Sequence, residues 1–218
     1  MRSFRLLDLI VPQRCAGCAA PATAWCRTCA RTLRTPQPVD RQGLPPAYAL
    51  AHYRGAPRRA VLAYKERGRR ELAAQLGQAL AAALPALPPI RAGPPEPVVL
   101  IPAPSRPSAA RTRGGQHMTT VAIRCARALS AAGHPATVAP ALRLDARAVD
   151  SIGLDPAARA ANLLGRLHPD PRRAPPPGTP AVLLDDVITT GATATACVAA
   201  LHSIGVPVQA VLALTVAG

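Results

Sequence analysis

The spacing of hydrophobic residues changes along the chain and predicts where helices and strands lie. Leucine recurs at every fourth position in an alanine-rich run, which predicts a helix over 69–84 that ends at Pro85. A second apolar face with helical spacing extends from Met118 to Leu129 and predicts another helix. The stretch 85–97, rich in proline and glycine, is expected to be a loop.

Short apolar runs bounded by proline, glycine or polar residues indicate buried strands. Because these runs alternate with helical segments, the chain is predicted to be an α/β protein with a parallel sheet. Strands are expected over 48–53, 98–101, 137–142, 181–184 and 208–214, further helices over 155–164 and 192–204, and loops over 143–153 and 169–180.

The charge of the chain is strongly positive. With 218 residues the chain is long enough for one domain plus a small appendage, and it has 26 basic and 11 acidic residues, giving a net charge of +15. Lys65 is the single lysine among many arginines, so compositional drift is one explanation. The other is an anionic partner, either nucleic acid or a phosphorylated small molecule. Aromatic residues make up only 2%, which disfavours a protein that stacks single-stranded bases.

The hydrophobic segments also bear on location. No run approaches the roughly 20 apolar residues of a membrane helix, so no membrane insertion is expected. No secretory signal peptide is visible, and a cytoplasmic location is the default expectation. Cytoplasmic thiols stay reduced, so paired cysteines there indicate a metal site rather than a disulfide.

Four of the six cysteines form two CxxC pairs separated by seven residues: Cys15, Cys18, Cys26 and Cys29. Four thiolates at this spacing can close a tetrahedral, structural Zn²⁺ site. A redox CxxC motif or a degenerate finger are the alternatives. Cys125 and Cys197 lie on apolar helix faces and are expected in the core.

Two adjacent carboxylates, Asp185 and Asp186, end the predicted strand 181–184 and precede a turn of small residues. They are the candidate catalytic pair, able to accept hydrogen bonds from ribose hydroxyls directly or through Mg²⁺. The turn opens a helix whose N–H groups can hold a phosphate. An ordinary strand-to-helix turn capped by Asp and Thr is the alternative. The candidate phosphate-binding residues are Thr189, Thr190, Gly191, Ala192 and Thr193.

A second candidate phosphate loop follows the predicted strand 98–101. Arg106, Arg111 and Arg113 lie within eight residues, followed by Gly114. Arginine side chains match phosphate oxygens in a bidentate manner, so this loop can hold a diphosphate. A solvated loop in an arginine-rich protein is the alternative.

The segment 181–193 resembles the signature of type I phosphoribosyltransferases for 5-phosphoribosyl 1-diphosphate (PRPP). The resemblance implies that Asp185 and Asp186 face the ribose, that Thr189 to Thr193 hold the 5′-phosphate, and that Mg²⁺ accompanies PRPP.

The order of a strand, Pro102-Ala103-Pro104 and then Arg113-Gly114 is similar to the ComF family of competence-associated, phosphoribosyltransferase-like proteins. That family usually continues with Phe-Asn-Gln, whereas this chain has Gly115-Gln116-His117, so only Arg113 and Gly114 are carried over. The pattern of Gly153-Leu154, Arg159 and Asn162-Leu163 is also similar, without the customary preceding Gln.

The ComF resemblance implies a type I phosphoribosyltransferase fold preceded by a small four-cysteine zinc finger. The expected divisions are a finger over 1–35, a linker and hood over 36–95, and the transferase-like domain over 96–218. Arg143 and Arg147 would lie on a loop that closes over the site, or on solvated surface. Lys65 would face the site, or carry surface charge.

Two functions remain open at this point. One is a Mg²⁺-dependent phosphoribosyltransferase, in which an unknown acceptor displaces diphosphate from PRPP. The other, implied by the ComF resemblance, is a non-catalytic DNA-uptake protein that binds single-stranded DNA and a helicase or recombination-mediator partner. Nothing in 36–95 identifies an acceptor base.

Overall fold

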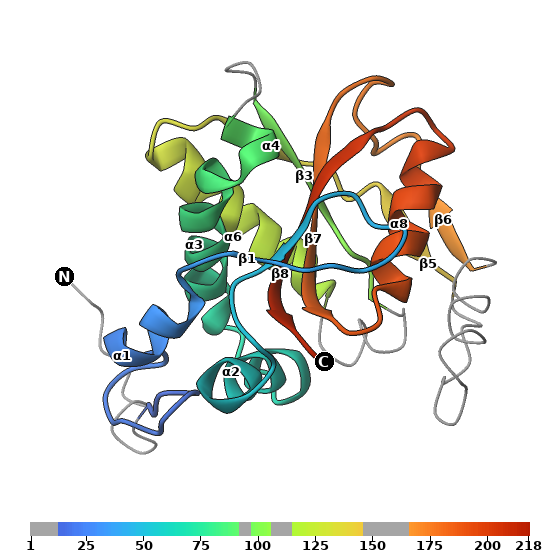
Figure 1. Ribbon diagram of the computed structural model, residues 1–218. Helices are drawn as coiled ribbons and strands as arrows, with labels where there is room; N and C mark the ends of the chain where they lie inside the picture. The colour runs from blue at the N-terminus through green and yellow to red at the C-terminus, as the bar shows by residue number, and fades with distance from the viewer. Residues whose placement is uncertain (1–12, 92–96, 106–114, 146–165) are drawn as a thin grey trace.

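A largely parallel sheet forms the centre of the molecule. The structure is a computed structural model that describes residues 13–91, 97–105, 115–145 and 166–218. All neighbouring strands in this sheet run parallel except the first pair, β1 and β2 (Figure 1). The strand order is β1 (Gln37–Pro38), β2 (Ala47–Ala49), β8 (Val208–Val216), β7 (Ala181–Ile188), β3 (Val98–Pro102) and β4 (Ala136–Val138). The predicted mixed α/β architecture with a mostly parallel sheet is confirmed.

Two helices pack together on one face of the sheet, α3 (Leu72–Ala83) and α6 (His117–Ala131) (Figure 1). The predicted leucine stripe is confirmed, because its four leucines are fully buried. The two helices approach closely at Gly77, where a Cβ atom would lie 2.8 Å from the backbone nitrogen of Cys125. Cys125 is itself completely buried, as expected.

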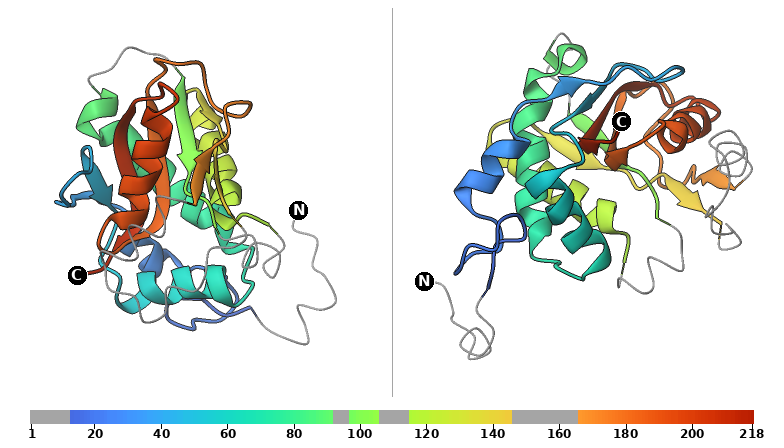
Figure 2. Two further views of the ribbon diagram at one scale, coloured as in Figure 1. Left: turned by 90° about the vertical axis from the view of Figure 1, so that its right-hand side faces the viewer. Right: turned by 60° about the horizontal axis from the view of Figure 1, so that its bottom comes forward.

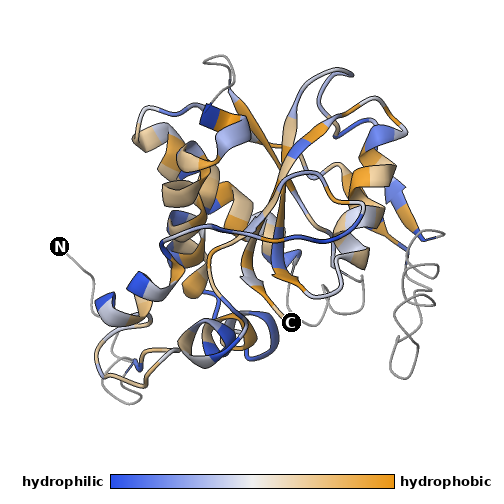
Figure 3. Ribbon diagram, in the orientation of Figure 1, coloured by the Kyte–Doolittle hydropathy of each residue, from blue (hydrophilic) through white to orange (hydrophobic). Residues whose placement is uncertain are grey.

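The opposite face is covered by α8 (Ala192–His202) and by a two-stranded antiparallel ribbon, β5 (Leu142–Leu144) and β6 (Leu167–Pro169). This second core contains Cys197, which is fully buried as predicted. Hydrophobic residues dominate β3, β7 and β8 between the two covers (Figure 3). The central strands are therefore buried on both faces, as parallel strands generally are.

The N-terminal part of the described chain packs against this α/β core. It contains α1 (Arg27–Ala30), the 3₁₀ turn η2 (Arg31–Leu33) and α2 (Gly55–Glu66). Trp25 and Leu33 belong to the same hydrophobic cluster as residues of α3 and α6. Figures 1 and 2 place α1 and α2 at the end of the molecule toward which β7 and β8 run. Segment 36–95 also contributes β1 and β2 to the central sheet.

Several element boundaries differ from the sequence predictions. The expected strand 137–142 is two short strands in different sheets, because Pro140 lacks an N–H group to continue the ladder. The expected strand 48–53 is regular only in β2, after which His52 forms an isolated bridge with Val216. The stretch 85–97 contains η3 (Leu84–Ala86) and α4 (Pro88–Arg91).

Three other predicted elements agree with the structure, and one lies outside the described residues. The strands expected over 98–101 and 208–214 and the helix expected over 192–204 correspond to β3, β8 and α8. Helix α2 is not predicted by the sequence patterns. The helix expected over 155–164 lies outside the described residues. Among the helices described, none is long and apolar enough to cross a membrane.

Candidate functional site

The carboxyl end of β7 places the predicted phosphate turn at the edge of the sheet. The strand continues through both aspartates to Ile188, and α8 begins at Ala192. Gly191 is the N-cap of α8 with φ +88°, a left-handed conformation that glycine adopts without strain. Thr189 and Thr190 are exposed in the turn. The structure therefore brings the threonines and Gly191 together beside the N-terminus of α8.

The two aspartates point to different faces of the sheet, as neighbours along a strand do. Asp185 lies on the α8 side, and its Oδ1 accepts a hydrogen bond of 2.8 Å from the backbone N–H of Asp186. Asp186 lies on the side covered by α2 and α6. Both aspartates are buried. The pair predicted to act together is thus divided between two environments.

Asp186 is held by two side chains from different helices. The Lys65 ammonium on α2 lies 2.8 Å from Asp186 Oδ2, and the imidazole Nε2 of His117 on α6 lies 2.7 Å from the same oxygen. The side chains of Asp186 and His117 are 8% and 9% exposed, whereas that of Lys65 is 32% exposed. The carboxylate is therefore enclosed, with its cationic partner at the more open side.

Further hydrogen bonds hold His117 in place. Its Nδ1 lies 2.6 Å from the Ser105 hydroxyl, and Tyr64 donates from its hydroxyl to the His117 backbone carbonyl over 2.8 Å. The Gln116 side chain accepts from the Ser105 backbone N–H at 2.6 Å and donates to the Ser105 carbonyl at 3.1 Å. The loop after β3 and the start of α6 are joined by these bonds, which orient the imidazole toward Asp186.

The surroundings shift the pKa values of the two aspartates in opposite directions. Burial, together with the charge of Asp186, raises the pKa of Asp185 above its ordinary value. Burial also raises the pKa of Asp186, but the hydrogen bond from His117 and the charge of Lys65 outweigh it and leave that pKa lower than usual. Asp186 is therefore the more readily ionised of the two carboxylates, whereas Asp185 keeps its proton to a higher pH.

Arg41 connects the β1–β2 loop to the phosphate turn, a contact that the sequence did not reveal. Its Nε donates to the Thr189 carbonyl at 2.9 Å, and its Nη2 donates to the Ala217 carbonyl at 3.1 Å. A Cβ atom at Gly191 would lie 3.3 Å from Arg41 Cβ. The guanidinium group thus joins the turn to the C-terminal end of the chain and adds a positive charge beside the turn.

The second predicted phosphate loop lies outside the described residues, including Arg106, Arg111, Arg113 and Gly114. The same holds for Arg147. Arg143 is exposed on β5, opposite His168, rather than in an irregular segment.

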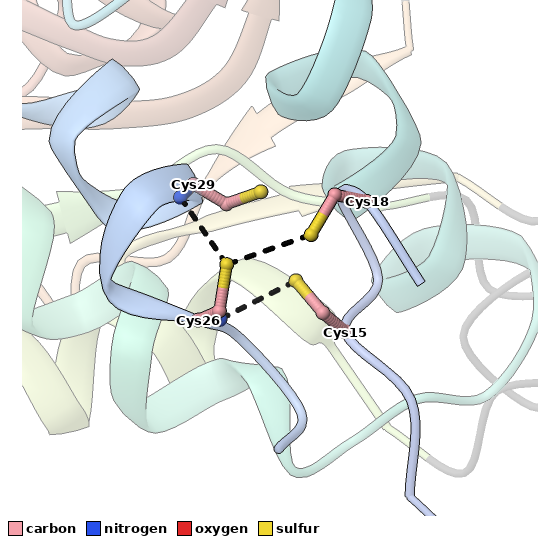
Figure 4. Close-up of side chains that lie close together, drawn as sticks. All are labelled: Cys15, Cys18, Cys26 and Cys29. Carbon is pink, nitrogen blue, oxygen red and sulfur yellow. Dashed lines mark hydrogen bonds between the residues drawn. The ribbon is translucent and has the colours of Figure 1, made fainter. Parts of the chain in front are cut away.

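The four predicted zinc ligands converge near α1. Their sulfur atoms all lie within 4.8 Å of one another, and in Figure 4 the thiol groups point toward a common centre. Backbone N–H groups donate to two of these sulfurs, from Cys26 to Cys15 at 3.3 Å and from Cys29 to Cys26 at 3.5 Å. All six cysteines are free of disulfide bonds. Four convergent thiols fit a closed structural Zn²⁺ site.

The cysteine cluster is packed tightly against α2. A Cβ atom at Gly17 would lie 3.0 Å from the Cβ atom of Ala56 on α2 and 2.6 Å from Cys29 Sγ. Arg59 on α2 donates to the Gly17 carbonyl. Within the described parts of the chain, these cysteines are the one group of three or more metal-ligating side chains. Helix α2 therefore contacts the cysteine cluster through Arg59 and reaches Asp186 through Lys65.

Sequence reasoning named Asp186 and Lys65 but missed Ser105, His117 and Arg41. His117 and Asp186 are 69 positions apart, and Arg41 and Thr189 are 148 apart. No local spacing could have signalled these contacts, because they depend on the sheet order.

The chain matches no protein-family model and no curated protein. Fold and site together define a mixed α/β protein with a four-cysteine cluster suited to zinc and a buried, cation-paired carboxylate at the end of a central strand.

Proposed function

We propose that this chain binds PRPP or a related ribose phosphate at the carboxyl end of β7, in a type I phosphoribosyltransferase fold of the ComF kind. The observation that carries the proposal is the neighbourhood of two features. One is the Thr189–Gly191 turn at the N-terminus of α8, and the other is the buried pair Asp185 and Asp186 on the preceding strand. Ligands of open parallel sheets bind at the carboxyl ends of the strands.

Each feature matches one part of a ribose phosphate. A helix N-terminus with exposed hydroxyls suits the phosphate, because N–H groups and the helix dipole favour negative charge. The ionised Asp186 carboxylate suits the ribose hydroxyls, which donate hydrogen bonds to it. Arg41 adds positive charge near the phosphate end. The arrangement supports recognition of a molecule that is anionic at one end and hydroxyl-rich at the other.

Phosphoribosyl transfer is the reaction that such a site would promote. An acceptor nucleophile forms a bond to the anomeric carbon of PRPP while the bond to diphosphate breaks. Positive charge develops on the ribose in the transition state, and a fixed nearby carboxylate stabilises it. Asp186, held by Lys65 and His117, is the residue placed for that role.

Calorimetric titration with PRPP and with ribose 5-phosphate tests the proposal. Wild-type protein should bind at least one of them saturably, and Asp185→Ala/Asp186→Ala should abolish binding. Asp170→Asn, which alters a carboxylate beside the β5–β6 ribbon, is the matched control and should bind as wild type does. Absence of binding by folded, zinc-loaded wild type would contradict the proposal.

A second candidate function is binding of single-stranded DNA. It is favoured by exposed arginines near the cysteine cluster and on or beside α2, in a region with few acidic residues: Arg27, Arg31, Arg34, Arg54 and Arg58. Such binding would weaken steeply with salt, because each phosphate contact releases counterions. Fluorescence anisotropy with labelled single-stranded DNA at several salt concentrations tests this. A helicase or recombination-mediator partner stays a prediction of the ComF resemblance.

A further inference from the structure

We propose that the ribose-phosphate end of this site is recognised without a divalent cation, because the Lys65 ammonium group occupies the position at Asp186 that Mg²⁺ would need. The inference rests on the proposed function and goes beyond it, since the family resemblance implies Mg²⁺. It assigns to a side chain the charge neutralisation that a bound metal would otherwise supply.

The contacts of a single oxygen atom carry the inference. Lys65 Nζ and His117 Nε2 lie 2.8 Å and 2.7 Å from Asp186 Oδ2, and both are hydrogen-bond distances. The two donors come from different helices and converge on a carboxylate that is almost completely enclosed. Residues of this chain therefore already occupy Asp186 Oδ2 with two donors, one of them the Lys65 cation.

The residues at this position do not fit Mg²⁺. This ion requires near-octahedral oxygen ligands at about 2.0–2.1 Å, so Asp186 Oδ2 could bind it only by exchanging Lys65, and a metal at Oδ1 would still face the neighbouring ammonium charge. An ammonium group a few ångströms from a dication is strongly repelled, most of all in a buried site. Asp185 cannot complete a shared site, because it lies on the other face of β7 and accepts from a backbone N–H.

Lys65 is held in this position by the fold. Tyr64, its neighbour on α2, is hydrogen-bonded to the His117 carbonyl, and Arg59 on the same helix is bonded to the Gly17 carbonyl of the cysteine cluster. Both contacts fix α2 relative to α6 and to the finger. Because the cation is held in advance, binding of the ligand does not require assembly of a metal site.

The paired carboxylate can still receive a ribose. An ionised carboxylate offers about four acceptor sites, and Lys65 and His117 use two of them. The Lys65 side chain is 32% exposed, so the cation lies at the accessible side of Asp186. A ribose hydroxyl bound there donates to Asp186 beside a fixed positive charge.

Titration of ribose 5-phosphate into zinc-loaded protein, with and without added Mg²⁺, tests the inference. This probe lacks the diphosphate, the part of PRPP that binds Mg²⁺ most strongly, so most of the ligand's own affinity for Mg²⁺ is removed. The metal-free buffer is prepared without chelator, since a chelator would also remove the structural zinc. The variants are Lys65→Met and, as a matched control, Arg67→Met, which removes an exposed positive charge at the C-cap of the same helix.

The expected result is that the wild-type dissociation constants with and without Mg²⁺ agree within about threefold. Lys65→Met should bind at least about tenfold more weakly without Mg²⁺ and should recover affinity when Mg²⁺ is added. Arg67→Met should follow the wild type in both buffers. Circular dichroism of each variant establishes that it is folded.

Two outcomes would overturn the inference: wild type that binds only with Mg²⁺, or folded Lys65→Met that binds as wild type does without Mg²⁺. If Lys65→Met fails to fold, the comparison of wild-type affinity with and without Mg²⁺ still tests the inference. Absence of binding in both buffers would instead contradict the proposed function, so the two failures are distinguishable.

Discussion

The cysteine cluster and the Asp186 site are both compact groups of reactive side chains, but they are built in different ways. The four cysteines come from one short segment, and their sulfur atoms converge within 4.8 Å. The groups around Asp186 come from α2, from the loop after β3, from α6 and from β7. The first cluster depends on local turns and is suited to a metal, whereas the second depends on the central sheet and its helices.

The two regions are joined by one helix, α2. Helix α2 contacts the cysteine cluster through Arg59 and Asp186 through Lys65. The local cysteine cluster thus supports α2, which forms one wall of the Asp186 site. Damage to the finger should reach the Asp186 site through α2, while damage at Asp186 should leave the finger intact.

The largest effect is expected from Cys29→Ser, which removes a buried ligand of the proposed zinc site. Loss of a structural metal removes several kcal/mol of folding free energy. Since each kcal/mol moves the midpoint by about 2–4 °C in a domain of this size, thermal unfolding should begin about 10 °C lower. Metal analysis should find less than one equivalent of zinc.

Cys125→Ala is the control for Cys29→Ser, because Cys125 is buried in α6 away from the cluster. It should keep a full equivalent of zinc despite some loss of core packing. Stoichiometric zinc in Cys29→Ser would contradict the assignment of that ligand.

The next largest effect should separate the two aspartates. Asp186→Asn removes the charge that pairs with Lys65 and His117, and we expect a loss of about 2–3 kcal/mol, below the value for fully buried pairs because Lys65 is partly exposed. Asp185→Asn keeps the oxygen that accepts from the Asp186 N–H and removes a destabilised charge. It should leave stability at pH 8 unchanged or higher. Urea unfolding of both variants measures the difference.

The pH dependence should distinguish the aspartates as well. The raised pKa of Asp185 means that the native state holds a proton that the unfolded state has lost, so stability falls as pH rises from about 3.8 toward that raised value. The lowered pKa of Asp186 gives stability that is present at neutral pH and is lost as pH falls below the ordinary Asp range. Any gain in Asp185→Asn should therefore disappear near pH 4. If the free energy of unfolding of both variants changed with pH in the same direction relative to wild type, the opposite pKa shifts of the two aspartates would be contradicted.

A smaller effect should follow from Arg59→Met, which removes the hydrogen bond between α2 and the Gly17 carbonyl. We expect a loss of about 1 kcal/mol, typical of one hydrogen bond, measured by urea unfolding. The control is Arg54→Met, since Arg54 is exposed at the N-cap of α2 and its side chain makes no capping bond. Equal stability of the two variants would show that this contact does not couple the finger to α2.

The smallest effect should come from Arg41→Gln, which loosens the phosphate turn without touching Asp186. Affinity for ribose 5-phosphate should fall about threefold to tenfold, consistent with one partly exposed charge. Arg41→Lys should recover part of the loss through its charge. Unchanged calorimetric affinity in Arg41→Gln would mean that the turn does not hold the phosphate.

Local patterns allowed prediction of the central elements and of the cysteine cluster. The leucine stripe of α3, the apolar runs of β3, β7 and β8, and the CxxC spacing each lie within a few residues of sequence. The fold class followed from their alternation along the chain. Such features depend on the repeat of hydrophobic residues and on the spacing of motifs, both of which can be read from a single sequence.

The rest depended on tertiary contacts. Helix α2 has Gly55 and Pro57 in its first turn, and five of its residues are buried, so its place in the fold depends on packing against the core. His117 became part of the site only because α6 lies beside β7. Asp185 and Asp186 are adjacent in sequence, yet the pleat of the strand sends them to opposite faces.

Backbone NMR of ¹⁵N-labelled, zinc-loaded protein during titration with ribose 5-phosphate tests most directly whether the end of β7 is the ligand site. Phosphate binding at the N-terminus of α8 should shift the amide signals of Gly191 and Ala192 first, together with those of Asp186. Asp170→Asn should give the same pattern. Saturable shifts confined to another part of the chain, or no shifts at saturating ligand, would contradict the assignment.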